Sequence, residues 1–216
     1  MLLYHFTQAE YALDNVEKKR IKIAQLHKLN DPYELSAVCA EPPYGVKNRD
    51  ALVNMFKENI GIICFSEKYN CPIMWGHYAD SHTGICLVFE VSGEFKNSSL
   101  LKVKYCKNLL KVCIDQEGRL VEAEKLAKKI VSHKYKGWEY EKEYRVFVPL
   151  EGKVPENGNY FYDFTDEFCL KGVILGCKCQ YEVGDDKFKA ITENYHDAIA
   201  VTKARLSDTQ FSVEKE

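Results

Sequence analysis

The densest group of side chains able to do chemistry lies between Met74 and Gly84, a segment that reads Met-Trp-Gly-His-Tyr-Ala-Asp-Ser-His-Thr-Gly. It contains two histidines, an aspartate, a tryptophan and a tyrosine, and an apolar run at residues 85–89 follows directly. Binding and catalytic sites combine aromatic walls with a few aimed polar groups. The segment therefore predicts a site at the entrance to a buried strand, although a packed aromatic turn has the same composition.

Two smaller clusters lie earlier in the chain. In a strand over residues 2–7, alternation places His5 and Thr7 on one face, so that a histidine and a hydroxyl are presented together. Asn30 and Asp31 begin the sequence Asn-Asp-Pro-Tyr-Glu, whose residue types are favoured in turns for local reasons. A structural histidine and a plain turn are the ordinary explanations, and supporting roles at a site are the functional ones.

An acidic cluster lies near the middle of the second half of the chain. If residues 139–145 form a strand, Glu139, Glu141, Glu143 and Arg145 share one face. Carboxylates on one face repel each other unless they are solvated, paired or used. Glu143 is then either a rigidly held catalytic carboxylate or an ion-pair partner of Arg145 or a lysine.

Metal binding is not expected from the spacing of ligand residues. His77 and Asp80 are three residues apart, but His82 follows His77 by five, which is a poor spacing for two ligands on one helix face. Cys177 and Cys179 lack a second pair at a zinc-finger spacing. A metal-dependent nuclease or phosphodiesterase that uses the two histidines and Asp80 remains an alternative.

The bulk composition is that of an ordinary globular protein. The chain has 216 residues, 46% of them hydrophobic, and a net charge of -2, which suits a single domain over 1–216 with no general basic field for nucleic acid. No apolar run approaches the roughly 20 residues of a membrane helix, and no secretory signal is recognised at the start. We therefore expect a cytoplasmic protein without membrane contact, whose nine cysteines are reduced thiols.

Hydrophobic periodicity predicts an α+β fold with a mixed, mainly antiparallel sheet core and flanking helices, because strands and helices interleave without a strict βαβ rhythm. The expected strands are 2–7, 20–24, 61–66, 84–91, 103–105, 144–148, 170–175 and 198–201. The expected helices are 8–19, with Thr7 as N-cap, and 48–59, 116–133 and 188–196.

In this order, the clusters resemble a widespread bacterial family known as a domain of unknown function, number twenty-nine seventy-one. The matching pieces are Leu3-Tyr4-His5-Phe6, Asn30-Asp31-Pro32-Tyr33-Glu34, Cys64-Phe65-Ser66, residues 74–84, and Trp138-x-Tyr140-Glu141-x-Glu143-x-Arg145. The family name implies no activity.

The opening Tyr4-His5-Phe6-Thr7, followed by a helix and a short strand, is also similar to ADP-ribosyltransferases of the DNA-targeting toxin and RNA 2′-phosphotransferase kind. This resemblance implies an ADP-ribosyltransferase-like fold with NAD as substrate and Glu143 as the catalytic residue. The NAD-contacting residues would be His5, Thr7, Ser66, Trp75 and Tyr78. The supporting residues would be Asn30, Asp31, His77, Asp80, His82, Glu141 and Arg145.

The expected function is therefore transfer of ADP-ribose from NAD to a nucleic acid or a protein, in phage defence or a toxin system. A fixed carboxylate would stabilise the oxocarbenium-like ribose formed when the bond to nicotinamide breaks. A catalytic Glu143 predicts that Glu143→Gln abolishes turnover and preserves stability, whereas an ion-paired Glu143 predicts the reverse. A non-catalytic nucleotide- or ligand-sensing module is the alternative from another class.

Overall fold

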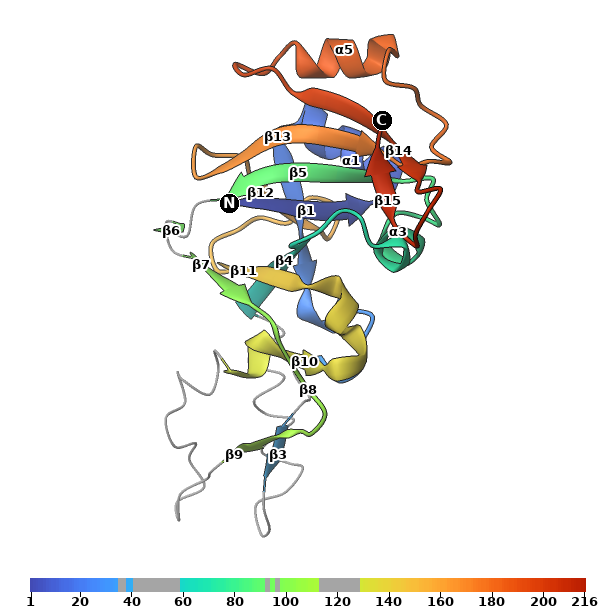
Figure 1. Ribbon diagram of the computed structural model, residues 1–216. Helices are drawn as coiled ribbons and strands as arrows, with labels where there is room; N and C mark the ends of the chain where they lie inside the picture. Colours follow the sequence, from blue (N-terminus) through green and yellow to red (C-terminus); the bar gives the residue numbers. More distant parts are fainter. Residues whose placement is uncertain (35–37, 41–58, 92–93, 96–97, 113–128) are drawn as a thin grey trace.

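A computed structural model of the chain describes residues 1–34, 38–40, 59–91, 94–95, 98–112 and 129–216 (Figure 1). The helix expected over 48–59 and most of the helix expected over 116–133 lie outside the described residues. No helix within the described ranges is long and apolar enough to cross a membrane.

The core of the fold is a curled 11-stranded sheet whose strands follow the order β15-β14-β13-β5-β1-β4-β11-β7-β6, with β12 and β2 joined to β4 (Figure 1). All of its pairings are antiparallel except that between β13 and β14. The mixed, mainly antiparallel α+β architecture expected from the sequence is thereby confirmed. The strands of this sheet are β1 (Leu2–Thr7), β2 (Arg20–Gln25), β4 (Ile60–Ser66), β5 (Ile85–Val91), β6 (Glu94–Phe95), β7 (Ser98–Lys102), β11 (Glu143–Pro149), β12 (Tyr160–Asp163), β13 (Phe168–Leu175), β14 (Ala200–Leu206) and β15 (Val213–Lys215).

Two short parallel pairs and several helical segments, among them residues 129–132 at the end of a helix, complete the described structure. The pairs join β8 (Lys104–Cys106) to β10 (His133–Tyr135) and β3 (Val38–Ala40) to β9 (Leu110–Val112). The helices are α1 (Ala9–Glu17), α3 (Pro72–Tyr78) and α5 (Asp186–Thr192), and the 3-10 helices are η1 (Leu26–Lys28) and η2 (Lys136–Glu141).

Alternation along the central strands divides the apolar residues between two faces of the sheet. Leu87 and Phe89 of β5 pack with Leu13 and Val16 of α1 in one core. On the other face, Trp75 of α3 is fully buried in a core that also contains Phe6, Cys86 and Val88. The helix α1 and the helix α3 therefore cover opposite faces, as expected when each strand buries both of its sides.

The first helix begins later than the sequence predicted. Thr7 still belongs to β1, where it pairs with Ile85, and Gln8 is the N-cap of α1 without a side-chain capping bond. The expectation that Thr7 caps the helix is therefore wrong, because the strand ladder holds its backbone in extended geometry.

One irregularity of the sheet creates space for a site. Strand β1 pairs with β4 at Tyr4 and Ser66, the last residue of β4, whereas the start of β4 pairs with β2, at Ala24↔Ile62 and Gln25↔Gly61. The strands β1 and β4 therefore separate beyond their shared bridge. Side chains at this separation are not covered by a neighbouring strand.

Candidate functional site

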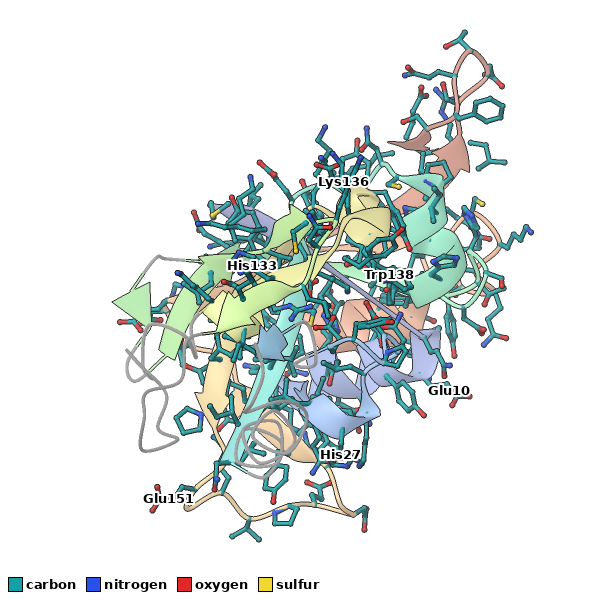
Figure 2. The ribbon with its side chains drawn as sticks, turned by 90° about the horizontal axis from the view of Figure 1, so that it is seen from below. Glu10, His27, His133, Lys136, Trp138 and Glu151 are labelled. Atoms are coloured by element: carbon teal, nitrogen blue, oxygen red, sulfur yellow. The ribbon has the colours of Figure 1, made fainter. Side chains whose placement is uncertain are left out.

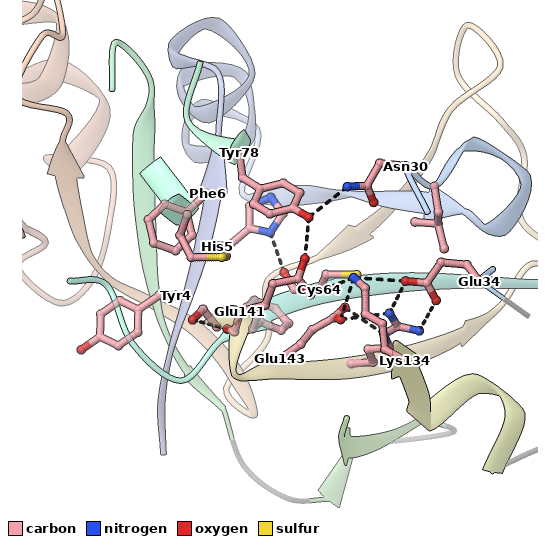
Figure 3. A pocket seen from close by; sticks show the side chains of 15 residues that line it. Tyr4, His5, Phe6, Asn30, Glu34, Cys64, Tyr78, Lys134, Glu141 and Glu143 are labelled. Carbon is pink, nitrogen blue, oxygen red and sulfur yellow. Dashed lines mark hydrogen bonds and ion pairs between the residues drawn. The ribbon is translucent and has the colours of Figure 1, made fainter. Parts of the chain in front are cut away.

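A cavity of about 140 Å³ opens where β1 and β4 separate (Figure 3). Its walls come from β1, β4, the turn after η1, α3, β10, and the junction of η2 with β11. Aromatic rings of Tyr4, Phe6, Phe65 and Tyr78 line it beside carboxylates. This mixture of apolar walls and a few polar groups is typical of a small-molecule site.

The structure brings together about half of the residues that the sequence singled out. Those that line the cavity are His5, Asn30, Ser66, Tyr78, Glu141, Glu143 and Arg145. Those outside its lining are Thr7, Asp31, Trp75, His77, Asp80 and His82. The joint placement of the first-strand histidine and the acidic cluster agrees with the idea of one shared site.

His5 occupies the gap between the two separating strands. Its Nδ1 lies 2.9 Å from the carbonyl oxygen of Cys64. Because a carbonyl only accepts hydrogen bonds, Nδ1 carries the proton and Nε2 is left as an acceptor. Burial lowers the pKa of His5, although the bond to Cys64 opposes the shift, so the ring is neutral at pH 7.

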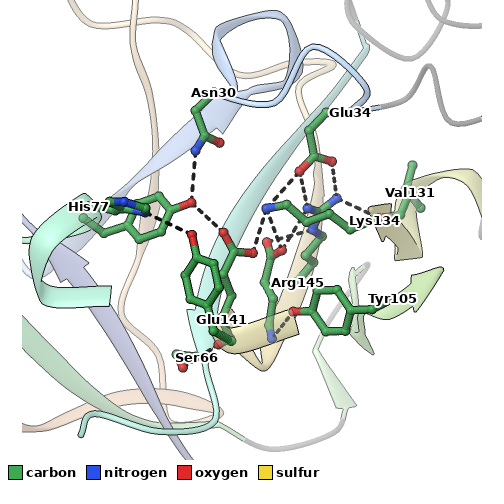
Figure 4. Close-up of polar contacts among 12 residues, drawn as sticks. Asn30, Glu34, Ser66, His77, Tyr105, Val131, Lys134, Glu141 and Arg145 are labelled. Carbon is green, nitrogen blue, oxygen red and sulfur yellow. Dashed lines mark hydrogen bonds and ion pairs between the residues drawn. The ribbon is translucent and has the colours of Figure 1, made fainter. Parts of the chain in front are cut away.

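The charged part of the site is organised by Arg145, which is 1% exposed (Figure 4). Nη1 and Nη2 donate to Glu34 at 2.8 and 2.6 Å, and Nε and Nη2 donate to Glu143 at 2.8 and 2.9 Å. Nη1 also donates to the carbonyl of Val131 at 3.0 Å. These bonds use all the donors of the guanidinium group, which satisfies a buried charge that would otherwise be costly.

Lys134 provides the second cation of this buried cluster. Its Nζ lies 2.7 Å from Glu141, 3.1 Å from Glu34 and 3.3 Å from Glu143. The cluster thus joins β10, η2, β11 and the turn at residue 34 through charge-assisted contacts. Sequence reasoning missed Lys134, because nothing in its spacing distinguishes it among the 30 lysines and arginines of the chain.

Glu141 reaches the site from a 3-10 helix, so the strand considered over residues 139–145 does not form in its first part, whereas the strand expected over 144–148 is confirmed as β11. The helix η2 ends at Glu141, Lys142 adopts a left-handed φ of 48°, and β11 begins at Glu143. Glutamates at every second position have the sequence pattern of a strand, even where a helical turn lies between them. The reversal at Lys142 turns the Glu141 carboxylate into the cavity and leaves Glu139 exposed.

A chain of neutral donors also holds Glu141. The Asn30 amide donates to the Tyr78 hydroxyl at 3.0 Å, and that hydroxyl donates to Oε1 of Glu141 at 2.5 Å. Ser66 holds the backbone of Glu141, because its Oγ donates to the carbonyl of that residue at 2.6 Å. The last turn of η2 is therefore fixed at both its backbone and its side chain.

The two neighbouring glutamates have opposite pKa shifts. Burial raises the pKa of Glu141 to about 7, with the charge of Glu143 adding to the shift and Lys134 opposing it. Burial also acts on Glu143, but the charges of Arg145 and Lys134 outweigh it and lower the pKa of Glu143 to about 2. A pair of carboxyl groups pushed apart in this way is a feature of acid–base sites.

Glu141→Gln is expected to remove a pH dependence of stability. The raised pKa favours the protonated carboxyl in the folded protein, so its stabilisation is complete below the unfolded pKa of about 4.3 and is lost as the pH rises through about 7. The wild type should therefore lose about 2 to 3 kcal/mol relative to the variant between roughly pH 5 and pH 8.

Denaturant unfolding at both pH values measures this difference. Glu139→Gln, an exposed glutamate of the same 3-10 helix, should follow the wild type. A wild-type-to-Glu141→Gln difference that is the same at both pH values would contradict the raised pKa.

Trp75, expected to contact a cofactor, is a core residue. Its ring is fully buried, packs edge-on against Phe6 at 5.2 Å, and donates from Nε1 to the carbonyl of Tyr69 at 2.6 Å. His82 stacks on the tryptophan at 6.3 Å, and its Nδ1 lies 3.7 Å from Sγ of Cys177. Both residues therefore support the helix α3 and do not reach the cavity.

Asp31 and Asp80 have local roles in turns. Asp31 accepts a hydrogen bond from the backbone N–H of Tyr33 at 2.8 Å, and Asp80 accepts one from the hydroxyl of Thr83 at 3.0 Å. Asp80 and the two residues after it all have positive φ, so the helical neighbourhood expected for His77 and Asp80 does not form. Within the described ranges, no group of three or more ligand residues is placed to hold a metal ion.

His77 lies near the rim of the site with two other aromatic residues. Its Nδ1 lies 3.0 Å from the hydroxyl of Tyr140, and its ring packs against Trp138 at 6.4 Å. Figure 2 views the molecule from the side of β10 and η2, where Trp138 is labelled. This aromatic group joins α3 to η2 next to the cavity.

Glu34 is the second residue of the site that sequence reasoning passed over. It closes the turn whose earlier members, Asn30 and Asp31, were singled out, and its carboxylate takes both terminal nitrogens of Arg145. A buried arginine with one strand neighbour as partner needs a second carboxylate. Nothing in the residues of the turn indicates that Glu34 is the carboxylate that pairs with Arg145.

Comparison with known proteins gives one match. No curated protein and no solved structure matches the chain. The matched segment includes most of α3, all of β5 and η2, and the first half of β11, and so Tyr78, Glu141, Glu143 and Arg145. Residues 74–146 match the family model described as "Protein of unknown function (DUF2971)", which confirms the resemblance to that family over this part of the chain.

Proposed function

We propose that the protein is an ADP-ribosyltransferase-like enzyme that uses NAD as its substrate and that Glu141 is the carboxylate that meets the ribose. One observation carries the proposal. A first-strand histidine, aromatic walls and two carboxylates with opposite pKa shifts line a single cavity. Perturbed titratable groups that meet in a pocket favour a functional site over a purely structural one.

The contacts favour Glu141 over Glu143 for the reacting role. Both oxygens of Glu143 accept hydrogen bonds from Arg145. The arginine therefore neutralises the negative charge that would stabilise a positively charged ribose. Among the described residues, Oε1 of Glu141 accepts only from the neutral hydroxyl of Tyr78, while Oε2 accepts from Lys134. Glu141 therefore keeps more of its charge available, and Glu143 takes the ion-pair role that was the alternative from the sequence.

The proposed reaction breaks the bond between C1′ of the ribose and the ring nitrogen of nicotinamide. The bonding electrons leave with nicotinamide, which departs as a neutral ring, and positive charge develops on the ribose. Ionised Glu141 stabilises this charge, and a nucleophilic atom of the acceptor then forms a bond to C1′ and loses its proton. The acceptor is a nucleic acid or a protein, as in a toxin or phage-defence system.

The position of the cavity supports this proposal. His5 of β1, Ser66 of β4 and Glu143 of β11 come from three neighbouring strands, and Ser66 pairs with Glu143 across the ladder. Sites on strands are held more rigidly than sites on loops, which suits electrostatic catalysis. An ADP-ribosyltransferase-like arrangement of the sheet is part of the same proposal.

A sensing module is the second candidate, and one observation favours it. Every carboxylate oxygen of Glu34, Glu141 and Glu143 already has a partner among the described residues. A closed network of this kind is suited to binding a ligand without reacting with it.

Nicotinamide release separates the two candidates. The purified protein is incubated with NAD, free nicotinamide is measured by chromatography, and NAD binding is measured by calorimetry. The enzyme proposal predicts binding and release. Binding without release would favour the sensing module, and the absence of both would overturn the proposal of an NAD site.

A further inference from the structure

The buried charges around the cavity do not cancel. Among the described residues, the cluster contains three carboxylates, Glu34, Glu141 and Glu143, but only two cations, Lys134 and Arg145. When all three carboxylates are ionised, one negative charge is left over. The contacts place that excess at Glu141, because Arg145 is shared by the other two glutamates and does not bond to Glu141.

The walls around this charge are aromatic. Tyr4, Phe6, Phe65 and Tyr78 line the cavity, and the faces of such rings carry partial negative charge. A ring face and a carboxylate in a water-poor pocket both attract a cation more strongly than they do in water. The described cation beside Glu141, Lys134, is itself surrounded by three carboxylates and opposes a bound cation less than a free lysine would.

The size of the cavity limits the ligand to one ring. Its volume is about 140 Å³, and an apolar cavity of about 150 Å³ in another protein holds one benzene molecule. A six-membered ring with a small substituent fits, and a whole dinucleotide does not. Any larger ligand must place one ring inside and the rest of its structure outside.

We propose that the cavity selects a cationic aromatic ring, a pyridinium, over a neutral ring of the same shape, and that Glu141 determines this selectivity. The inference rests on the proposed function and deepens it, because the nicotinamide ring of NAD is a pyridinium and becomes neutral when it leaves. The cavity would then bind the substrate ring more tightly than the product ring. Selectivity for charge would also assist product release.

The charge of Glu141 makes this selectivity dependent on pH. Burial raises the pKa of Glu141 to about 7, so the excess negative charge appears as the pH rises through neutrality. A bound cation favours the ionised carboxylate, and by linkage its affinity rises over the same range. A neutral ring has no such preference, and its affinity should be independent of pH.

Burial and ion pairing act on the other described groups that face Glu141. Burial raises the pKa values of Tyr78, Tyr105 and Cys64, which stay neutral. Burial lowers the pKa of His5, which is also neutral. Lys134, Arg145, Glu34 and Glu143 form the ion-paired part of the cluster. Glu141 is therefore the group whose titration changes the charge of the cavity near pH 7.

Two probes of nearly equal shape test the inference. 1-Methylnicotinamide is a pyridinium cation and nicotinamide is neutral, and calorimetry measures the affinity of each at roughly pH 6, 7 and 8. We expect the cation to bind about tenfold more tightly or better at the highest pH. The preference should decrease toward the lowest pH, disappear in Glu141→Gln, and persist in Glu139→Gln. Equal affinities, a preference that does not change with pH, or no binding of either probe would overturn the inference.

A second variant keeps the test decisive if Glu141→Gln does not fold. Tyr78→Phe retains the ring but removes the hydroxyl that bonds to ionised Glu141, so it should shift the midpoint of the cation preference to higher pH. An unchanged midpoint would contradict the role of Glu141. If the cation preference holds but no nicotinamide is released from NAD, the enzyme proposal fails alone. If release occurs without the preference, only this inference fails.

Discussion

Arg145→Met is expected to lower the free energy of unfolding by about 3 to 5 kcal/mol. Methionine keeps an unbranched apolar side chain but removes the guanidinium group that bonds to Glu34 and Glu143. Lys134 would then face three buried carboxylates alone. Two of these carboxylates would have to be protonated or reach water, and either event costs folding free energy.

Chemical denaturation of the wild type and the variant measures this loss. Arg205→Met is the matched control, because Arg205 is 43% exposed in its contacts with Asp208 and Glu214. An exposed ion pair is worth about 0 to 1 kcal/mol, so the control should change little. Equal effects of the two substitutions would show that the buried cluster does not carry the stability assigned to it here.

Much of the fold could be predicted from the sequence, because its strands bury apolar residues in a clear pattern. The strands β1, β2, β4 and β5 were expected within one or two residues of their observed bounds. In β1 the alternation also placed the side chains of His5 and Phe6 on opposite faces of the strand. Phe6 packs in the core with Trp75, and His5 bonds to the carbonyl of Cys64. Periodicity reports burial, and burial dominates the energy of these strands.

The acidic segment could not be predicted in the same way. Glu139, Glu141 and Glu143 alternate like strand residues, but the chain turns at Lys142 and separates them between a 3-10 helix and a strand. The spacing of charged residues does not show which of them are buried, so tertiary contacts decide their geometry. The hydrogen bond from Ser66 to the carbonyl of Glu141 is one such contact, and no local pattern encodes it.

The sequence predicted that several clusters meet at one site, but it did not predict which glutamate of that site is neutralised. His5, Tyr78 and Glu143 line one cavity, as a shared site requires. Trp75 belongs to the core beneath α3, because a large ring at a helix position facing the sheet is buried by packing alone, and His82 stacks on it. Which glutamate is neutralised depends on its distances from Arg145 and Lys134, and these distances are set by the folded chain.

Glu141→Gln is expected to reduce the rate of nicotinamide release from NAD by about a hundredfold or more, the usual cost of removing one aimed electrostatic group. Glutamine preserves the shape of the side chain but has no charge to stabilise an oxocarbenium-like ribose. The rate of the wild type should also rise with pH as Glu141 ionises, since burial raises its pKa to about 7. The variant should lack that dependence.

The most direct test of the central claim compares nicotinamide release by the wild type, Glu141→Gln and Glu139→Gln, with a melting curve for each protein. Glu139 is exposed on the same 3-10 helix, so its substitution controls for the loss of one negative charge nearby. The account predicts release by the wild type and Glu139→Gln, and a loss of about a hundredfold or more in a folded Glu141→Gln. Full release by a folded Glu141→Gln would contradict it.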